Sequence, residues 1–159
     1  EAKLANAQGM ISNWQAWVDF SKIENNGSIK VVARSQNAEG IFSQPVIGQY
    51  SVDAIEPTTE IRVPQNGAEV KSPFIVFGVC GDNAEMRGVE LELKDMGLNQ
   101  YWNGTIWTKD KATFFKRVVQ ERWHVELSAG AGSYRVTAKS LDRAGNYDTS
   151  PEVREFKVK

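Results

Sequence analysis

The chain contains an internal repeat, and this feature constrains its fold more than any other. The segment "GSIKVVARSQNAEG" (Gly27–Gly40) aligns with "GSYRVTAKSLDRAG" (Gly132–Gly145), 105 residues further on. Upstream, "VDFS" from Val18 matches "VELS" from Val125, and downstream "QYSVD" matches the closing "EFKVK". Self-similarity at a fixed spacing is the signature of modules that follow one another along a chain. We therefore expect two copies of one structural unit.

Only the back half of the first copy is recognisable. Glu1 aligns with about Thr108, and no part of the first copy matches residues 57–107. The predicted organisation is the C-terminal part of an incomplete repeat (1–53), a linker (54–57) and a complete repeat (58–159). On this interpretation the chain is a piece of a longer array.

The complete repeat has the hydrophobic pattern of β-strands. Apolar residues alternate with polar ones, and Gly- and Pro-rich turns such as "PQNG", "AGAG" and "DRAGN" separate the alternating runs. Many short strands in about 100 residues predict an all-β, immunoglobulin-like Greek-key sandwich. The expected strands are Thr59–Val63, Phe74–Cys80, Val89–Lys94, Gln100–Trp102, Thr105–Thr108, Thr113–Val118, Trp123–Leu127, Tyr134–Ser140 and Val153–Val158.

The same alternation predicts which residues fill the space between the two sheets. They are Val76, Gly78, Cys80, Leu91, Leu93, Trp123, Val125, Leu127, Val136 and Ala138. Cys80 is the only cysteine, so an intrachain disulfide is impossible, and we expect a small buried thiol.

Composition argues against several classes of function. Nineteen basic and twenty acidic residues give a net charge of -1 without long runs of either sign, which disfavours nucleic-acid and membrane-surface binding. No apolar run reaches the roughly 18 residues that span a bilayer. His124 is the only histidine, it is predicted to face solvent, and no zinc-ligand set or catalytic motif surrounds it. We therefore predict a non-enzymatic protein without a cofactor. Calcium is the one ion that stays a candidate, for the carboxylates described below.

Several segments of the second copy together resemble the bacterial Ig-like repeats found in tandem in large secreted or surface proteins, including adhesins. They are "IEPTTEIRVPQNGAEVKSPFIVFGVCGD", "YWNGTIWT", "GSYRVTAKSLDRAGN" and "SPEVREFKVK". The likeness covers Glu56 to Lys159 and, more loosely, the residues before it. It implies an extracellular location and neighbouring repeats of the same chain as partners. In the first copy "QNAEG" replaces "LDRAG", so a role of Asp142 need not recur there.

The segment "YWNGTIWT" is the first candidate site. Asn103-Gly104 between β-prone flanks predicts a two-residue hairpin turn. Trp102 would then lie opposite Thr105, and Tyr101 opposite Ile106. Tyr101, Trp102 and Trp107 either stack on a sugar ring or a protein partner, or they cover one end of the sandwich.

Four carboxylates form the second candidate site. In an immunoglobulin sandwich the linker, the loop after the second strand and the loop before the last strand share one pole. That places Asp53, Glu56, Asp82 and Asp142 near one another, where they could bind Ca²⁺ at the junction between repeats. The alternative is that Asp82 and Asp142 accept hydrogen bonds within their own turns.

The sequence thus predicts a spacer or stalk module of a secreted or cell-surface bacterial protein, with the short linker "SVDAIEP" limiting bending between repeats. The alternative is a carbohydrate- or protein-binding module that uses the hairpin Tyr101–Trp107, in an adhesin or attached to a polysaccharide-active enzyme.

Overall fold

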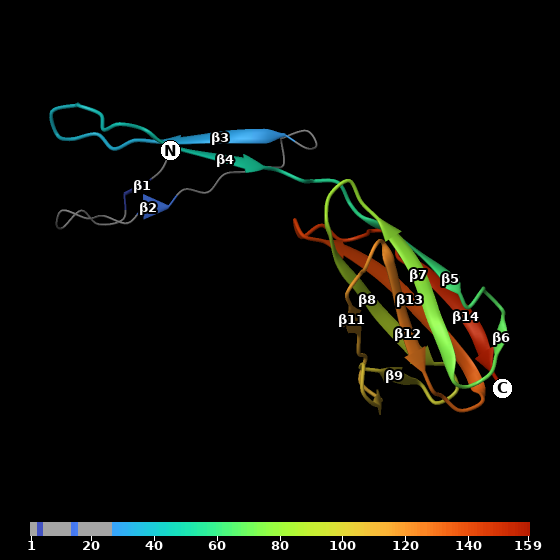
Figure 1. Cartoon of the computed structure of the whole chain (residues 1–159). Coiled ribbons are helices and arrows are strands. Elements are labelled where there is room, and N and C mark those ends of the chain that lie inside the picture. The colour runs from blue at the N-terminus through green and yellow to red at the C-terminus, as the bar shows by residue number, and fades with distance from the viewer. Residues whose placement is uncertain (1–2, 5–13, 16–26) are drawn as a thin grey trace. The chain divides into compact units, whose positions relative to one another are not determined.

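The computed structural model describes residues 3–4, 14–15 and 27–159, and the chain divides into two compact units, Glu1–Asp53 and Ala54–Lys159 (Figure 1). All the regular elements among the described residues are β-strands. No helix in this described part is long and apolar enough to cross a membrane.

The C-terminal unit consists of two sheets. The larger has the order β10-β9-β8-β13-β14-β6, with β11 also paired to β8, and the smaller has the order β12-β7-β5. The strands of the larger sheet are β6 (Glu69–Val70), β8 (Met86–Asp95), β9 (Gln100–Trp102), β10 (Trp107–Thr108), β11 (Phe114–Lys116), β13 (Gly132–Asp142) and β14 (Glu152–Val158). Those of the smaller are β5 (Thr58–Val63), β7 (Phe74–Gly81) and β12 (Arg122–Leu127).

The chain changes sheet five times, between β5 and β6, β6 and β7, β7 and β8, β11 and β12, and β12 and β13. Such crossings are the Greek-key connections of an immunoglobulin-like sandwich. The predicted all-β sandwich is therefore confirmed. The short β6, which pairs with β14 in parallel, has no counterpart among the expected strands.

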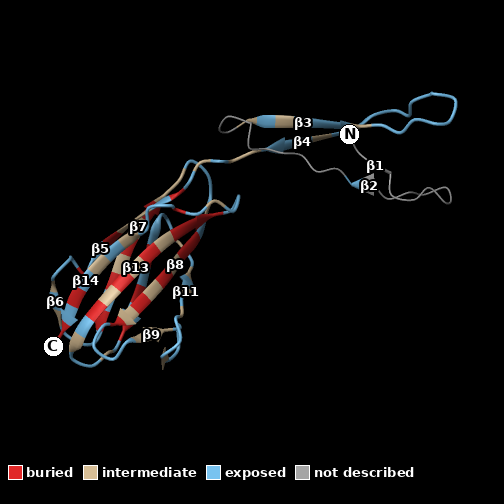
Figure 2. Ribbon diagram, turned by 180° about the vertical axis from the view of Figure 1, so that it is seen from behind, coloured by how far each residue is buried: buried red, intermediate tan, exposed pale blue. Residues whose placement is uncertain are grey.

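Alternation along each strand produces one core between the sheets. Along β12 the buried residues are Trp123, Val125 and Leu127, while His124 faces solvent as predicted. Figure 2 shows buried and intermediate positions alternating along β8 and β13. Every residue that the sequence placed in the core is buried. The core also includes Ile61, Phe74, Val89, Tyr134, Leu141, Phe156 and Val158.

A glycine makes room for the largest core side chain. Trp123 lies directly opposite Gly78 in the smaller sheet, and a Cβ at Gly78 would lie 2.2 Å from the Trp123 ring. The indole N–H donates to Oγ1 of Thr59 at 3.3 Å, so the buried ring keeps a hydrogen-bond partner. The Trp123 indole therefore packs directly on the backbone at position 78, where only glycine leaves enough space.

The N-terminal unit contains two antiparallel pairs of strands. β1 (Lys3–Leu4) pairs with β2 (Trp14–Gln15), and β3 (Ser28–Ala33) pairs with β4 (Val46–Ser51). The expected match of Val18–Ser21 to Val125–Ser128 lies outside the described residues.

Candidate functional site

The aromatic hairpin differs in register from the prediction. Trp102 pairs with Trp107, and Tyr101 pairs with Thr108, so the two-residue turn predicted at Asn103-Gly104 is wrong. The physical reason is the Asn103 side chain, whose Oδ1 accepts hydrogen bonds from the backbone N–H groups of Thr105 and Ile106, both at 3.0 Å. These bonds stabilise a four-residue loop in place of the tighter turn.

The new register places the two indoles side by side. Their ring centroids are 5.6 Å apart, and the Trp107 ring lies 5.7 Å from that of Tyr134 in the core. Both indoles are half-buried and pack against the hydrophobic core. Neighbouring strand residues face opposite sides of a sheet, so Tyr101 lies on the other face, where the ammonium of Lys94 is 5.2 Å from its ring centroid. The three rings do not form one platform.

The carboxylate candidates of the C-terminal unit centre on Asp142, which is fully buried at the end of β13. Its Oδ1 accepts hydrogen bonds from the backbone N–H groups of Gly145 at 2.6 Å and Asn146 at 2.8 Å. Its Oδ2 accepts one from the Asn146 side-chain amide at 2.7 Å. These are the bonds within the "DRAGN" turn that the sequence suggested as the alternative to metal binding.

Asp82, directly after β7, comes close to Asp142. A carboxylate oxygen of each lies within 4.8 Å of the other. Both Asp82 oxygens are buried without a hydrogen-bond partner, and within the described ranges neither residue belongs to an ion pair. Two negative charges at that distance repel by roughly 3 kcal/mol at an effective dielectric constant of about 20. A positive charge between the two carboxylates would relieve this repulsion.

The other two predicted ligands, Glu56 and Asp53, come before β5 in the chain. Glu56 is exposed, and its Oε2 accepts a hydrogen bond from Thr149 Oγ1 at 2.5 Å. It thus joins the linker to the loop before β14. Asp53 is the last residue of the N-terminal unit, four positions before the fully buried Pro57.

Asp148 is a buried carboxylate that the sequence analysis missed. It is 4% exposed, and its Oδ2 accepts a hydrogen bond from the Thr59 N–H at 3.1 Å. Its Oδ1 accepts one from the Ser150 N–H at 2.8 Å. The residue thereby joins the first strand of the sandwich to the loop before its last strand. The only available signal was an Asp two residues before the "SP" turn, which is common in loops.

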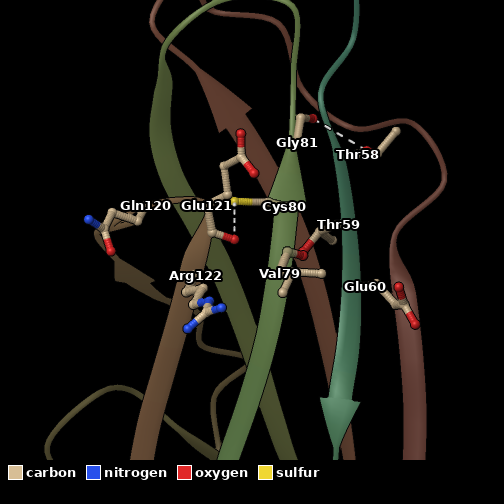
Figure 3. A pocket seen from close by; sticks show the side chains of 9 residues that line it. All are labelled: Thr58, Thr59, Glu60, Val79, Cys80, Gly81, Gln120, Glu121 and Arg122. Carbon is tan, nitrogen blue, oxygen red and sulfur yellow. Dashed lines mark hydrogen bonds between the residues drawn. The ribbon is translucent and has the colours of Figure 1, made fainter.

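A hollow of about 620 Å³ lies on the smaller sheet, over the ends of β5, β7 and β12 (Figure 3). Its lining includes Gln120 and Glu121, whose φ angles are 50° and 62°. Figure 3 shows the side chains of Gln120 and Glu60 pointing away from each other on opposite sides. A binding site for a small ligand requires polar groups that converge on one point, and the polar groups of this hollow do not converge.

The thiol of Cys80 lies beside this hollow but is itself buried. Burial, with a smaller contribution from the charge of Glu121, raises the pKa of Cys80 to about 11. A thiol with so high a pKa is a poor nucleophile at neutral pH because the thiolate is the reactive form. Cys80 therefore belongs to the core.

No protein-family model and no curated protein sequence matches the chain. Among solved structures, the chain is similar to the fibronectin(III)-like modules of Clostridium thermocellum CbhA, with 12% identity over 64% of this chain and 96% of that chain and a TM-score of 0.42. It is also similar to domains d3-d4 of the rat CD45 extracellular region, with 10% identity over 99% of this chain and 78% of that chain and a TM-score of 0.41. The fold described above rests on the strand order and register of the chain itself.

Proposed function

We propose that the chain is a non-enzymatic spacer of a multidomain secreted or cell-surface bacterial protein of the adhesin type. One observation carries this proposal. In the C-terminal unit the chain enters β5 at one end of the sandwich and leaves β14 at the opposite end (Figure 1). Each such repeat adds its own length to an array.

The length of each repeat follows from its longest strand. β13 has 11 residues, which corresponds to about 36 Å at the usual rise of a strand. Short linkers containing a proline keep successive repeats extended. Neighbouring repeats of the same chain are the expected partners, and the bacterial and extracellular assignment rests on the motifs that resemble bacterial Ig-like repeats.

Small-angle X-ray scattering tests the spacer. Proteins with one, two and three tandem copies of residues 54–159 should gain about 36–40 Å in maximum dimension for each copy. A maximum dimension that barely grows from one copy to three would mean that the repeats fold back on each other. That result would contradict the proposal.

We further propose that Ca²⁺ binds beside the linker through Asp82 and Asp142. The support is the close, buried pair of carboxylates, since Ca²⁺ takes six to eight oxygen ligands in flexible geometry. Oδ2 of Asp142 accepts only one turn bond, so its second lone pair remains available, whereas Oδ1 already accepts two bonds. Asp53 is proposed as a further ligand because four residues of chain reach at most about 14 Å from Pro57. Calcium would stiffen the linker.

Isothermal titration calorimetry of EDTA-treated protein with Ca²⁺ tests this site. The unmodified chain should release or absorb heat and should melt at a higher temperature with Ca²⁺. Asp82→Asn should lose both effects, whereas the exposed Asp110→Asn is a matched control that should keep them. Equal titrations of Asp82→Asn and the unmodified chain would exclude the site.

The second candidate function is binding of a glycan or a protein through Tyr101, Trp102 and Trp107. The observation in its favour is that all three rings remain partly exposed. A glycan panel monitored by tryptophan fluorescence tests it, with Trp107→Phe as the variant. A change that appears in the unmodified chain and vanishes in Trp107→Phe would favour binding, and no change with any glycan would exclude the sugar.

A further inference from the structure

The β3–β4 hairpin of the N-terminal unit exposes apolar side chains on a regular strand face. Ile29 pairs with Tyr50, Val31 with Gly48, and Ala33 with Val46, so these six residues share one face. Tyr50 is 58% exposed, Val46 74% and Val31 37%. A contiguous apolar face of this kind marks an interaction surface.

The hairpin has the same register as β13–β14 in the complete repeat. Ile29 and Tyr50 correspond to Tyr134 and Phe156 in the sequence alignment, and Tyr134 pairs directly with Phe156. The inward residues of the two hairpins are also alike. Val31 and Ala33 correspond to Val136 and Ala138, and Val52 corresponds to Val158.

The two hairpins differ in what covers this face. Tyr134 and Phe156 are 3% and 2% exposed, respectively, because they belong to the hydrophobic core of the C-terminal unit. Phe74 of β7 is one of these, with its ring centroid 5.4 Å from that of Phe156. In β4, by contrast, the Tyr50 ring lies over its own neighbour Gly48, where an added Cβ would come within 2.8 Å of the ring.

We propose that the β3–β4 face binds the front half of a sandwich of this same repeat type, a segment equivalent to β5–β9. That is the segment which covers the matching hairpin in the complete repeat, and there it also comes before it in the chain. An aromatic residue equivalent to Phe74 would pack on Tyr50. Residues equivalent to Leu93 and Leu91 would lie beside Val31 and Ala33 in the same sheet, as Leu93 pairs with Val136 and Leu91 with Ala138 in the complete repeat.

A second copy of this chain is a weaker occupant. Its β5, β7 and β12 already cover its own β13–β14, its β8 pairs with β13, and Val136 and Ala138 are almost completely buried. If a second copy covered the β3–β4 face with these strands, it would lose its own contacts to form equivalent ones. Association of two chains would also cost entropy. A front-half segment that has no β13–β14 hairpin of its own forms the contacts without displacing anything.

A fusion protein tests this inference. A second copy of residues 54–107 is placed directly before Glu1, because Glu1 aligns with about Thr108 and the fusion therefore restores a continuous repeat. Amide hydrogen exchange of Ile29–Ala33 and Val46–Ser51 should slow by about 100-fold or more relative to the unmodified chain. The amides of β13–β14 provide an internal reference because the C-terminal unit is unchanged.

Two variants of the fusion protein identify the face. Tyr50→Asp should abolish the added protection because Tyr50 lies on the proposed buried face. Val32→Asp is the matched control, since Val32 is also exposed but lies on the other face, and it should keep the protection. Unchanged exchange in β3–β4 of the fusion, with β13–β14 still protected, would overturn the proposal. Concentration-dependent protection of β3–β4 in the unmodified chain, with a dimer in sedimentation, would identify a second copy as the occupant and would also overturn it.

Discussion

The Asp148 carboxylate provides the sharpest test of how the sandwich is held together. It is buried, and each of its two oxygens accepts a hydrogen bond from a backbone N–H, one from Thr59 and one from Ser150. In Asp148→Asn, whichever way the amide turns, its NH₂ group faces one of these N–H groups. One donor then loses its acceptor, and the substitution also removes the charge that strengthens both bonds.

The size of the effect follows from those two losses. A hydrogen bond to a charged group contributes about 1.5–3 kcal/mol, and a buried donor left without an acceptor costs a similar amount. We expect Asp148→Asn to lower the free energy of unfolding of the C-terminal unit by about 2–4 kcal/mol. For a domain of this size, that corresponds to a decrease in Tm of roughly 10–25 °C.

Urea unfolding followed by circular dichroism measures the loss. Asp110→Asn is the matched control because Asp110 is exposed, and it should stay within about 0.5 kcal/mol of the unmodified chain. If Asp148→Asn unfolds at the same urea concentration as this control, the carboxylate does not join β5 to the loop before β14. The reasoning from buried hydrogen bonds would then be refuted for this site.

Three further predictions concern the core. Gly78→Ala should destabilise the C-terminal unit by about 2–4 kcal/mol in the same urea assay because the new methyl would lie 2.2 Å from an indole ring and 2.4 Å from a backbone carbonyl oxygen. Gly130→Ala, with nothing within 4 Å, is its control, and equal stability of the two variants would contradict the packing argument. The Cys80 thiol should react with iodoacetamide at pH 8 up to about 100-fold more slowly in the folded chain than in urea, since its pKa is raised to about 11 and the thiolate fraction is correspondingly smaller. Stability should also fall as pH rises through the range from about 9 to 11, because there the unfolded thiol ionises while the folded one keeps its proton. Equal alkylation rates in both states would show that Cys80 is accessible.

Much of the architecture could be predicted because buried and exposed residues alternate along a strand, which gives the sequence a hydrophobic period of two. The alternation in "RWHVELS" was sufficient to predict that Trp123, Val125 and Leu127 are buried and that His124 is exposed. The all-β sandwich followed from counting such runs and the turns between them. These are local properties, and neighbouring residues along the chain determine them.

The candidate sites depended on contacts that local patterns do not encode. The predicted hairpin register was wrong because the Asn103 side chain stabilises a four-residue loop. The dipeptide Asn-Gly is compatible with both this loop and the two-residue turn. Once Trp102 and Trp107 are paired, they pack towards Tyr134, which is distant in sequence. Asp148 was missed because its partner Thr59 lies 89 residues away.

The sequence by itself determined most of the strands of the C-terminal unit and the inward positions along them, since both follow from periodicity. Only the tertiary structure decided what each polar or aromatic side chain does. It brought Asp82 within reach of Asp142, directed Glu56 to Thr149, and placed Tyr101 on the face opposite Trp102. The physical reason is that burial depends on a side chain's own alternation, whereas its partners depend on how strands far apart in the chain are aligned across the sheets.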